Sequence, residues 1–232
     1  MKGHDVSMNS FPIQVDIVSD VVCPWCVIGY LQLAKASEQT GIPIQVRWQP
    51  FELNPQMGAE GENLREHLAA KYGISPEGSR QARERLRAIG AELGFAFNYA
   101  DDMRMVNTFA AHQLLHWAEE QGLGHALQLA LFSAFFSARK NLADGELLAD
   151  VAAGVGLDRA EALRVLQTQE RASAVREQQR YWLERGIDGV PAMVFEGRRL
   201  LTGARGEESY AQLLRRMAPE GSAQTSEGSA SQ

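Results

Sequence analysis

The sequence predicts an α/β fold built in the order β-α-β, a large all-helical insertion, and β-β-α. Three observations predict it: apolar and polar residues alternate in segments near the start, helical periodicity fills the middle of the chain, and two short apolar runs return near the end. Alternation with a period of two is typical of strands, and recurrence every three or four residues is typical of amphipathic helices. Neither end could bury a sheet alone, so the two ends are expected to pair in space.

The first segment predicts a β-α-β unit. Residues 13–19 (IQVDIVS) and 43–51 (PIQVRWQPF) have the alternation of strands. Between them, apolar residues recur at helical spacing from Pro24 to Gln39. Proline suits the first turn of a helix, where its missing N–H costs nothing, and Gly41 is a common residue just past a helix end.

Six stretches with helical periodicity form the middle of the chain. They are ENLREHLAAKYG, PEGSRQARERLRAIGAELG, NTFAAHQLLHWAEEQG, GHALQLALFSAFFSARK, DGELLADVAAGVG and DRAEALRVLQTQERASAVREQQRYWLERG. Residues that commonly open a helix predict its start at four places, namely Ser75-Pro76, Asn107-Thr108, Asp144 and Asp158.

The chain returns to β structure near its end. GVPAMVFEG and RRLLTG are joined by Glu196-Gly197, which predicts a hairpin, and GEESYAQLLRRMA predicts a final amphipathic helix. From Pro219 onward the residues are small and polar, which is typical of a disordered tail. The expected organisation is therefore residues 13–56 and 158–218 as two halves of one α/β domain, residues 57–157 as the helical insertion, and residues 219–232 as the tail.

Charge and hydropathy exclude some classes of partner. The chain has 29 acidic and 23 basic residues, a net charge of −6. This argues against nucleic acid, because phosphate binding needs a basic face. The most apolar stretch, HALQLALFSAFFSA, is too short to span a bilayer, and the opening MKGHDVSMNSFP lacks the apolar run of a signal peptide. We therefore expect a cytoplasmic protein without a membrane partner, in a compartment that keeps thiols reduced.

The two cysteines of the chain, Cys23 and Cys26, stand together in the sequence CPWC. Three interpretations are open: half of a metal site, a structural disulfide, or a redox dithiol. A structural disulfide is the weakest, because the cytosol is reducing and a bond across two intervening residues constrains the unfolded chain very little.

The redox interpretation follows from the predicted start of the helix at Pro24. Cys23 would lie at or next to the N-cap, where unpaired N–H groups and the positive end of the helix dipole favour a thiolate. Cys26 lies one turn later and is expected to be more covered. Cys23 would then be the attacking sulfur, and Cys26 would resolve the mixed disulfide. The intervening Pro24 and Trp25 are expected to tune the reduction potential.

Zinc binding remains the main alternative for the pair. His112 and His116 lie one helical turn apart in HQLLH, so the chain has the composition of a two-Cys, two-His site. However, residues 27–111 separate the cysteines from the histidines, whereas a zinc finger needs roughly 12–15 residues there. We therefore expect no metal, and packing on one helix face is the simpler role for the two histidines.

A second signal is the proline that opens the strand in GIDGVPAMVFEG. In the predicted topology this strand start faces the N-terminus of the cysteine helix. A cis Val190–Pro191 bond would present the backbone of Val190 beside Cys23, where it could pair with an extended substrate. An ordinary trans proline at a strand start is the alternative, and cis bonds are only ~5–6% of X-Pro bonds.

On these residues the sequence resembles the FrnE-like branch of the DsbA family in the thioredoxin superfamily. Four stretches carry the resemblance, which spans roughly residues 13–217: DIVSDVVCPWCVIG, PFELNP, NTFAAHQLLHWA and GIDGVPAMVF. It implies a thioredoxin-like fold whose insertion roofs the active-site groove. It also implies dithiol–disulfide oxidoreductase or isomerase activity on protein or small-molecule thiols, with Cys23 as nucleophile, Cys26 resolving and Pro191 cis.

The same resemblance implies a set of residues that line the groove. Beside Pro24, Trp25 and Val190 they are Phe51, Asn54, Asn107, Thr108 and His112. Packing is the alternative for the last five, and His112 could assist thiol deprotonation if it approaches Cys23. No cofactor is expected beyond the redox-active Cys23–Cys26 pair, with glutathione as a possible thiol substrate.

Two other functions stay open. The 2-hydroxychromene-2-carboxylate isomerase and kappa glutathione-transferase branch shares the insertion and uses glutathione, but it typically has Ser where Cys23 stands. The complete cysteine pair therefore favours redox exchange. A peptide-binding module is the non-enzymatic alternative, if the apolar stripe Phe132, Phe135 and Phe136 is exposed, although such a stripe is more often core.

Overall fold

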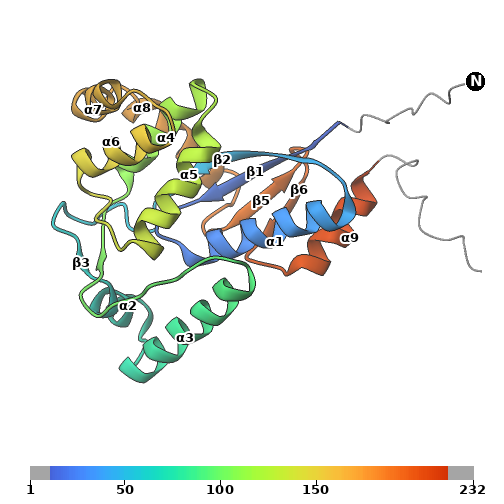
Figure 1. Ribbon diagram of the computed structural model, residues 1–232, viewed down its shortest axis with the longest axis horizontal. Helices are drawn as coiled ribbons and strands as arrows, with labels where there is room; N and C mark the ends of the chain where they lie inside the picture. Colours follow the sequence, from blue (N-terminus) through green and yellow to red (C-terminus); the bar gives the residue numbers. More distant parts are fainter. Residues whose placement is uncertain (1–10, 219–232) are drawn as a thin grey trace, which may run out of the picture.

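A four-stranded sheet organises the protein, which we describe from a computed structural model for residues 11–218 (Figure 1). The strands are β1 (Ile13–Ser19), β2 (Ile44–Pro50), β5 (Ala192–Phe195) and β6 (Arg199–Thr202), in the order β2-β1-β5-β6. β1 pairs with β2 in parallel and with β5 antiparallel, and β5 and β6 form an antiparallel hairpin. The predicted pairing of the two chain ends into one sheet is confirmed.

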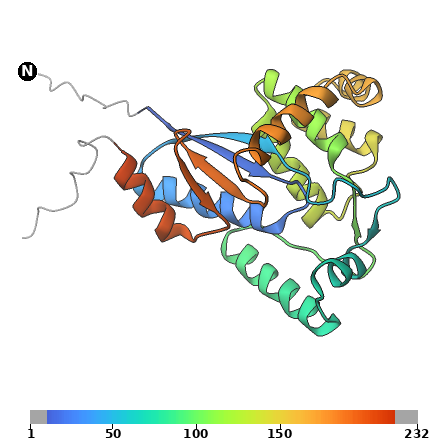
Figure 2. The ribbon, with the colours of Figure 1, turned by 180° about the vertical axis from the view of Figure 1, so that it is seen from behind.

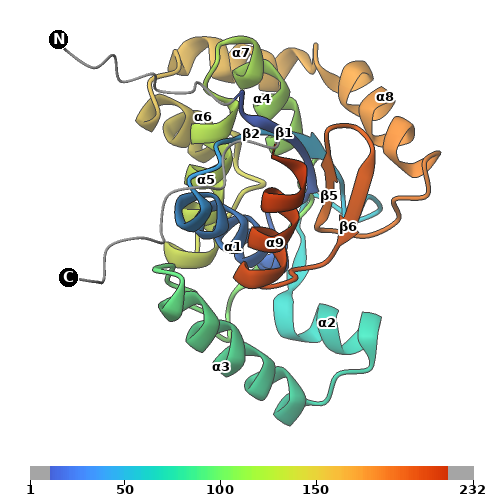
Figure 3. The same ribbon diagram turned by 90° about the vertical axis from the view of Figure 1, so that its right-hand side faces the viewer.

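Two helices cover one face of this sheet. α1 (Pro24–Thr40) and α9 (Glu207–Met217) lie side by side in front of the strands (Figure 3). Leu33 from α1 and Leu214 from α9 are fully buried together with Ile17 of β1 and Phe195 of β5. Tyr210 is buried in the same core, and its hydroxyl donates a hydrogen bond to the carbonyl of Gly203 at 3.2 Å.

The signals at the ends of α1 and of the hairpin act as the sequence predicts. Gly41 ends α1 in the left-handed conformation, with φ of 67°. Glu196 and Gly197 both have positive φ at the tip of the β5–β6 hairpin. Two consecutive residues with positive φ give the turn whose twist matches that of the flanking strands.

The chain between β2 and β5 is mainly helical. Its elements are β3 (Glu62–Asn63), α2 (Leu64–Tyr72), α3 (Pro76–Glu92), β4 (Arg104–Met105), α4 (Phe109–Glu120), α5 (Gly124–Phe132), the π-helical turn η1 (Ser133–Ser137), α6 (Gly145–Gly154), α7 (Arg159–Thr168) and α8 (Ala172–Leu183). Viewed from either side, they gather at the end of the sheet where β1 leads into α1 (Figures 1 and 2). Ser75, Asp144 and Asp158 cap helices with their side chains, as predicted, and Thr108 occupies an N-cap without a side-chain bond.

The insertion differs from the sequence prediction in three local features. The last predicted helical stretch is two helices, because Gln169 has a φ of 52° and ends α7. α5 gives way to the π-helical turn η1 at Ser133. The two-residue strands β3 and β4 pair with each other and are too short to leave a periodic pattern.

The aromatic stripe of the insertion is core rather than surface. Phe132, Phe135 and Phe136 are each about 1% exposed and pack with Leu114 and Leu127. This burial removes the observation that favoured a peptide-binding module. Within residues 11–218, no helix combines the length and apolarity needed to cross a membrane. The division of the chain at residues 57 and 158 stays a prediction, and the proposed tail lies outside the described residues.

A glycine allows α1 to approach the start of β5. A Cβ atom at Gly29 would lie 3.0 Å from Cε of Met193 and 3.4 Å from Cγ of Pro191. A Cβ at these distances would press on the neighbouring side chains, so Met193 or α1 would have to shift by a few tenths of an ångström. Gly29 therefore allows a close approach between Pro191 and the helix that bears the cysteines.

Replacing Gly29 by Val is expected to lower the free energy of unfolding by about 1–3 kcal/mol, because the added methyl groups overpack this contact. Denaturant unfolding measures the loss. Gly154→Val is the matched control, since a Cβ there meets nothing within 4 Å and the change should stay within about 0.5 kcal/mol. Equal losses in the two variants would contradict the role given to Gly29.

Candidate active site

The cysteine pair occupies the N-terminus of α1. Cys23 is the N-cap residue with extended backbone (φ −94°, ψ 112°), and Pro24 begins the helix. The Cys23 side chain makes no N-cap hydrogen bond. The N–H of Cys26 donates instead to the backbone carbonyl of Cys23 at 3.1 Å. Both cysteines are free thiols in this structure. The positive end of α1 and its unpaired N–H groups therefore lie around the first sulfur.

The two sulfurs have different surroundings. Cys26 is 0% exposed and Cys23 is 4% exposed. Burial raises the pKa of the Cys26 thiol well above its usual value, and the hydrogen bond and charge of the adjacent Cys23 raise it further. The Ser19 hydroxyl and the Asp20 backbone lower the pKa of Cys26 by less. Cys26 consequently remains a neutral thiol at neutral pH while Cys23 is reduced.

The start of β5 faces the first sulfur. The Val190–Pro191 peptide bond is cis, and the carbonyl oxygen of Val190 lies 3.8 Å from Cys23 Sγ. The carbonyl of Pro191 accepts a hydrogen bond from the N–H of Gly203 at 2.8 Å, which joins this turn to the end of β6. Trp25 follows at the surface with 40% of its area exposed. Backbone of Val190 is thus available beside Cys23 for pairing with a bound chain.

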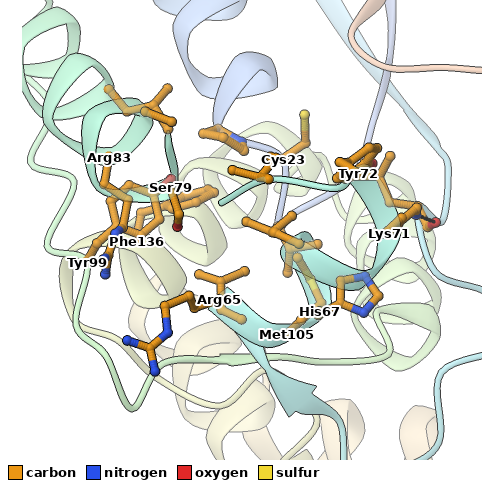
Figure 4. A pocket seen from close by; sticks show the side chains of 18 of the residues that line it. Cys23, Arg65, His67, Lys71, Tyr72, Ser79, Arg83, Tyr99, Met105 and Phe136 are labelled. Atoms are coloured by element: carbon orange, nitrogen blue, oxygen red, sulfur yellow. Dashed lines mark hydrogen bonds between the residues drawn. The ribbon is translucent and has the colours of Figure 1, made fainter. Parts of the chain in front are cut away.

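A partly open cavity of about 310 Å³ begins at Cys23. We call it the Cys23 pocket; its walls come from the cysteine turn, from Leu53 and Asn54, from α2 and α3, from the segment 99–105, and from Phe135 and Phe136. Figure 4 shows His67 and Lys71 on one side of the pocket and Arg83 and Tyr99 on the other. The insertion therefore roofs the site, as the family resemblance implies.

Asp20 joins the cysteine turn to the insertion. Its carbonyl accepts the N–H of Cys23 at 3.0 Å, and its Oδ2 accepts the N–H of Leu53 at 2.7 Å. Nε2 of His112, on α4, lies 3.5 Å from Asp20 Oδ1, and both side chains are almost completely buried. The hydrogen bond to Leu53 joins the cysteine turn to the segment after β2, whereas Asp20 Oδ1 and His112 Nε2 are buried without a hydrogen-bond partner among the described residues.

The structure divides the predicted site residues into two groups. Pro24, Trp25, Asn54 and Val190 line the Cys23 pocket together with Cys23. Phe51, Asn107, Thr108 and His112 do not line it, and their place in a substrate groove stays a prediction.

Phe51 packs against Val18 and Trp182 in a core on the sheet's other face. The side-chain N–H of Asn107 donates to the carbonyl of Met57, and its Oδ1 accepts the N–H of Phe109. Thr108 is buried at the start of α4. His112 contacts Asp20, not the pocket. These residues are adjacent in sequence to pocket-lining segments, but helix and strand geometry directs their side chains elsewhere.

Several pocket residues carry no sequence signal. Lys71 and Tyr72 at the end of α2, Arg83 on α3, and Tyr99 belong to ordinary amphipathic or loop patterns. Only the fold of the insertion brings them to Cys23.

The two histidines of HQLLH do not join the cysteines. His112 and His116 line a separate polar cavity of about 410 Å³ between β2, α4 and α5, which neither cysteine lines. Among residues 11–218 there is no group of three or more Cys, His, Asp or Glu side chains arranged to hold a metal ion.

Comparisons with known proteins agree with this geometry. The family model of the DSBA-like thioredoxin domain matches residues 14–215. A probable DsbA oxidoreductase from Streptomyces coelicolor superposes with a TM-score of 0.80, at 32% identity over 88% of this chain and 89% of that one. The cytosolic disulfide reductase DsbM from Pseudomonas aeruginosa, in a structure with glutathione, has a TM-score of 0.59 and 19% identity over 88% and 98% of the chains, a likeness of fold. The uncharacterised protein YwbO from Bacillus subtilis is 26% identical over 85% of this chain and 94% of its own length.

Alkylation of the reduced native protein at neutral pH is expected to modify Cys23 and spare Cys26. The raised pKa of Cys26 keeps it protonated and unreactive until the pH is strongly alkaline or the protein is unfolded. Iodoacetamide labelling followed by peptide mass spectrometry locates the adduct, and the Cys23→Ser and Cys26→Ser variants serve as paired controls. Faster labelling of Cys26 than of Cys23 would contradict the assignment.

Proposed function

Because the chain belongs to the DSBA-like thioredoxin domain family, we propose that it is a cytosolic dithiol–disulfide oxidoreductase or isomerase of the FrnE-like kind. It acts on protein or small-molecule thiols through Cys23 and Cys26 and needs no other cofactor. The observation that carries the proposal is the position of Cys23 Sγ, at the N-terminus of α1 and 3.8 Å from the carbonyl of Val190. The proposed cytosolic location is supported by the sequence expectation and by the likeness of fold to DsbM, a cytosolic disulfide reductase.

The first step is attack of the Cys23 thiolate on one sulfur of a substrate disulfide. A bond forms between Cys23 Sγ and that sulfur, the substrate S–S bond breaks, and the other substrate sulfur leaves as a thiolate with the bonding electrons. The helix N-terminus stabilises the attacking thiolate. An extended substrate segment pairs with the backbone of Val190, which holds the reacting sulfurs in line.

The second step uses Cys26 and completes a two-electron exchange. Cys26 loses its proton, attacks Cys23 Sγ and releases the second substrate thiolate, so the substrate is reduced and the Cys23–Cys26 disulfide forms. Reduced Cys23 is one cause of the raised pKa of Cys26. Once Cys23 is in a mixed disulfide its charge is gone, so the pKa of Cys26 falls and the resolving attack becomes easier. The reverse sequence oxidises a substrate dithiol.

A glutathione-dependent isomerase or transferase is the second candidate. The concave, largely apolar pocket beside Cys23 supports it, because small-molecule sites are typically concave and mostly apolar. The second cysteine favours the redox proposal, since a glutathione-dependent isomerisation needs no resolving thiol. Glutathione is compatible with both candidates, as a substrate of the first or a cofactor of the second.

The Cys23→Ser variant is expected to lose all catalysis of insulin reduction by dithiothreitol, falling to the uncatalysed rate, because no nucleophile remains. Cys26→Ser should accumulate a mixed disulfide with insulin that the wild type does not retain. Turbidity measures the first result, and a non-reducing gel measures the second.

Two outcomes would sink this proposal. Undiminished turnover in Cys23→Ser would show that Cys23 is not the nucleophile. Full activity of Cys26→Ser toward a small electrophile, dependent on added glutathione, would support the isomerase or transferase instead.

A further inference from the structure

We propose that the substrate disulfide carries an apolar ring-sized group together with an anionic group, and that the Cys23 pocket recognises both. This inference rests on the proposed function and deepens it by naming the substrate class. It follows from what the pocket walls offer: a largely apolar interior, a basic rim, and no acidic side chain among the residues that line it.

The interior of the pocket is apolar and of a defined size. Leucine, methionine and aromatic side chains form a large part of its wall, namely Leu53, Leu64, Leu68, Leu86, Met105, Tyr99, Phe135 and Phe136. Its volume of about 310 Å³ is about twice the ~150 Å³ of a cavity that holds benzene. A ring with substituents fits this space, and burying it there is favourable at about 25 cal/mol per Å² of apolar surface.

The phenol of Tyr99, in the pocket wall, remains neutral. Burial raises the pKa of the Tyr99 phenol, and the charge of Cys23 raises it further. Tyr99 therefore keeps its proton and adds no negative charge that would repel an anion. It can offer a hydrogen bond to a polar substituent of the bound group.

The rim is basic and only partly neutralised. Arg65 and Arg83 both face Asp101, at 4.0 and 3.1 Å. His67 pairs with Glu62 at 2.6 Å. Lys71 differs from these, because no carboxylate of the described residues lies within ion-pair distance of its Nζ.

Neutral acceptors hold the Lys71 ammonium in place. Nζ donates to the carbonyl of Leu53 and to Asn54 Oδ1, both at 2.7 Å. These bonds fix the position of the ammonium without cancelling its charge, and one proton remains to donate. A carboxylate or similar anion on the substrate would complete this site with a charge-assisted hydrogen bond.

The position of Cys23 in the wall connects recognition to chemistry. The sulfur that forms the mixed disulfide lies at the pocket, so the group attached to it enters the apolar interior while its anion reaches the rim. Cys23 thiolate attacks the recognised sulfur and displaces the other substrate sulfur as a thiolate, and Cys26 then releases the recognised thiol from Cys23, as in the proposed function. The substrate disulfide is the oxidant of this half-reaction, so a single turnover of prereduced protein needs no other reagent.

Four symmetric disulfides separate the two recognised features. 5,5′-Dithiobis(2-nitrobenzoate) has a ring and a carboxylate, 4,4′-dithiodipyridine a ring alone, 3,3′-dithiodipropionate a carboxylate alone, and bis(2-hydroxyethyl) disulfide neither. Stopped-flow oxidation of the reduced protein gives a rate constant for each. Dividing by the rate of the same disulfide with free dithiothreitol removes its intrinsic reactivity.

We expect the normalised rate to be highest for the ring with a carboxylate, by about tenfold or more over the disulfide with neither. Lys71→Met should lower the normalised rates of the two carboxylates about tenfold and leave the neutral pair unchanged, and Lys71→Arg should restore them. Tyr72→Ser should lower the rates of the two aromatic disulfides. Tyr72 lines the pocket yet is 56% exposed, so its loss spares the fold.

Matched surface variants control for nonspecific effects. Lys140→Met and Tyr181→Ser change exposed residues of the same types outside the pocket and should leave all four rates unchanged. Normalised rates that are equal for all four disulfides, or that stay unchanged in Lys71→Met and Tyr72→Ser, would overturn the inference while leaving the oxidoreductase proposal intact. A faster normalised reaction with oxidised glutathione than with the aromatic dicarboxylate would also overturn it. If Cys23 reacts with none of them, the proposed function itself fails.

Discussion

The pairing of β1 with β5 is the constraint on which the site depends. It places Val18 opposite Ala192, so that the turn after β1 and the turn before β5 meet at one end of the sheet. Cys23 and Val190 come within 3.8 Å although 167 positions separate them in the chain. The absence of a side chain at Gly29 lets α1 approach Pro191 closely. The N-terminus of α1 and the carbonyl of Val190 therefore lie on either side of Cys23 Sγ.

The helical insertion contributes both hydrogen bonds and wall residues to the site. Asp20 binds the N–H of Leu53, and Lys71 binds the carbonyl of the same residue. One short segment after β2 therefore links the cysteine turn to the rim of the pocket at α2. The insertion contributes the apolar interior as well, through Phe135 and Phe136. The cysteine turn thus belongs to the sheet and α1, and most of the pocket wall belongs to the helical region between β2 and β5.

Local signals allowed much of the fold to be predicted, including the position of the cysteine pair at the start of a helix. The alternation in β1, Pro24 at the start of α1, and Glu196-Gly197 in the hairpin each act within a few residues, so a single sequence contains them. The pocket could not be predicted in this way. Lys71 and Tyr99 come from different elements, and their meeting depends on packing over long sequence separations. The place of Phe51 could not be predicted either, because an apolar residue next to a groove-lining segment suits a groove wall and a hydrophobic core equally well. In the structure it packs in the core.

Equilibration of the protein in glutathione redox buffers tests the central claim most directly. The claim is that Cys23 and Cys26 act as one couple, with the first sulfur attacking and the second resolving. Mass spectrometry after acid quenching should show a single transition from two thiols to an intramolecular disulfide, with the loss of two hydrogens and no stable glutathione adduct. Persistence of two free thiols in oxidising buffer, or a stable glutathione adduct on Cys23 beside a free Cys26, would contradict it.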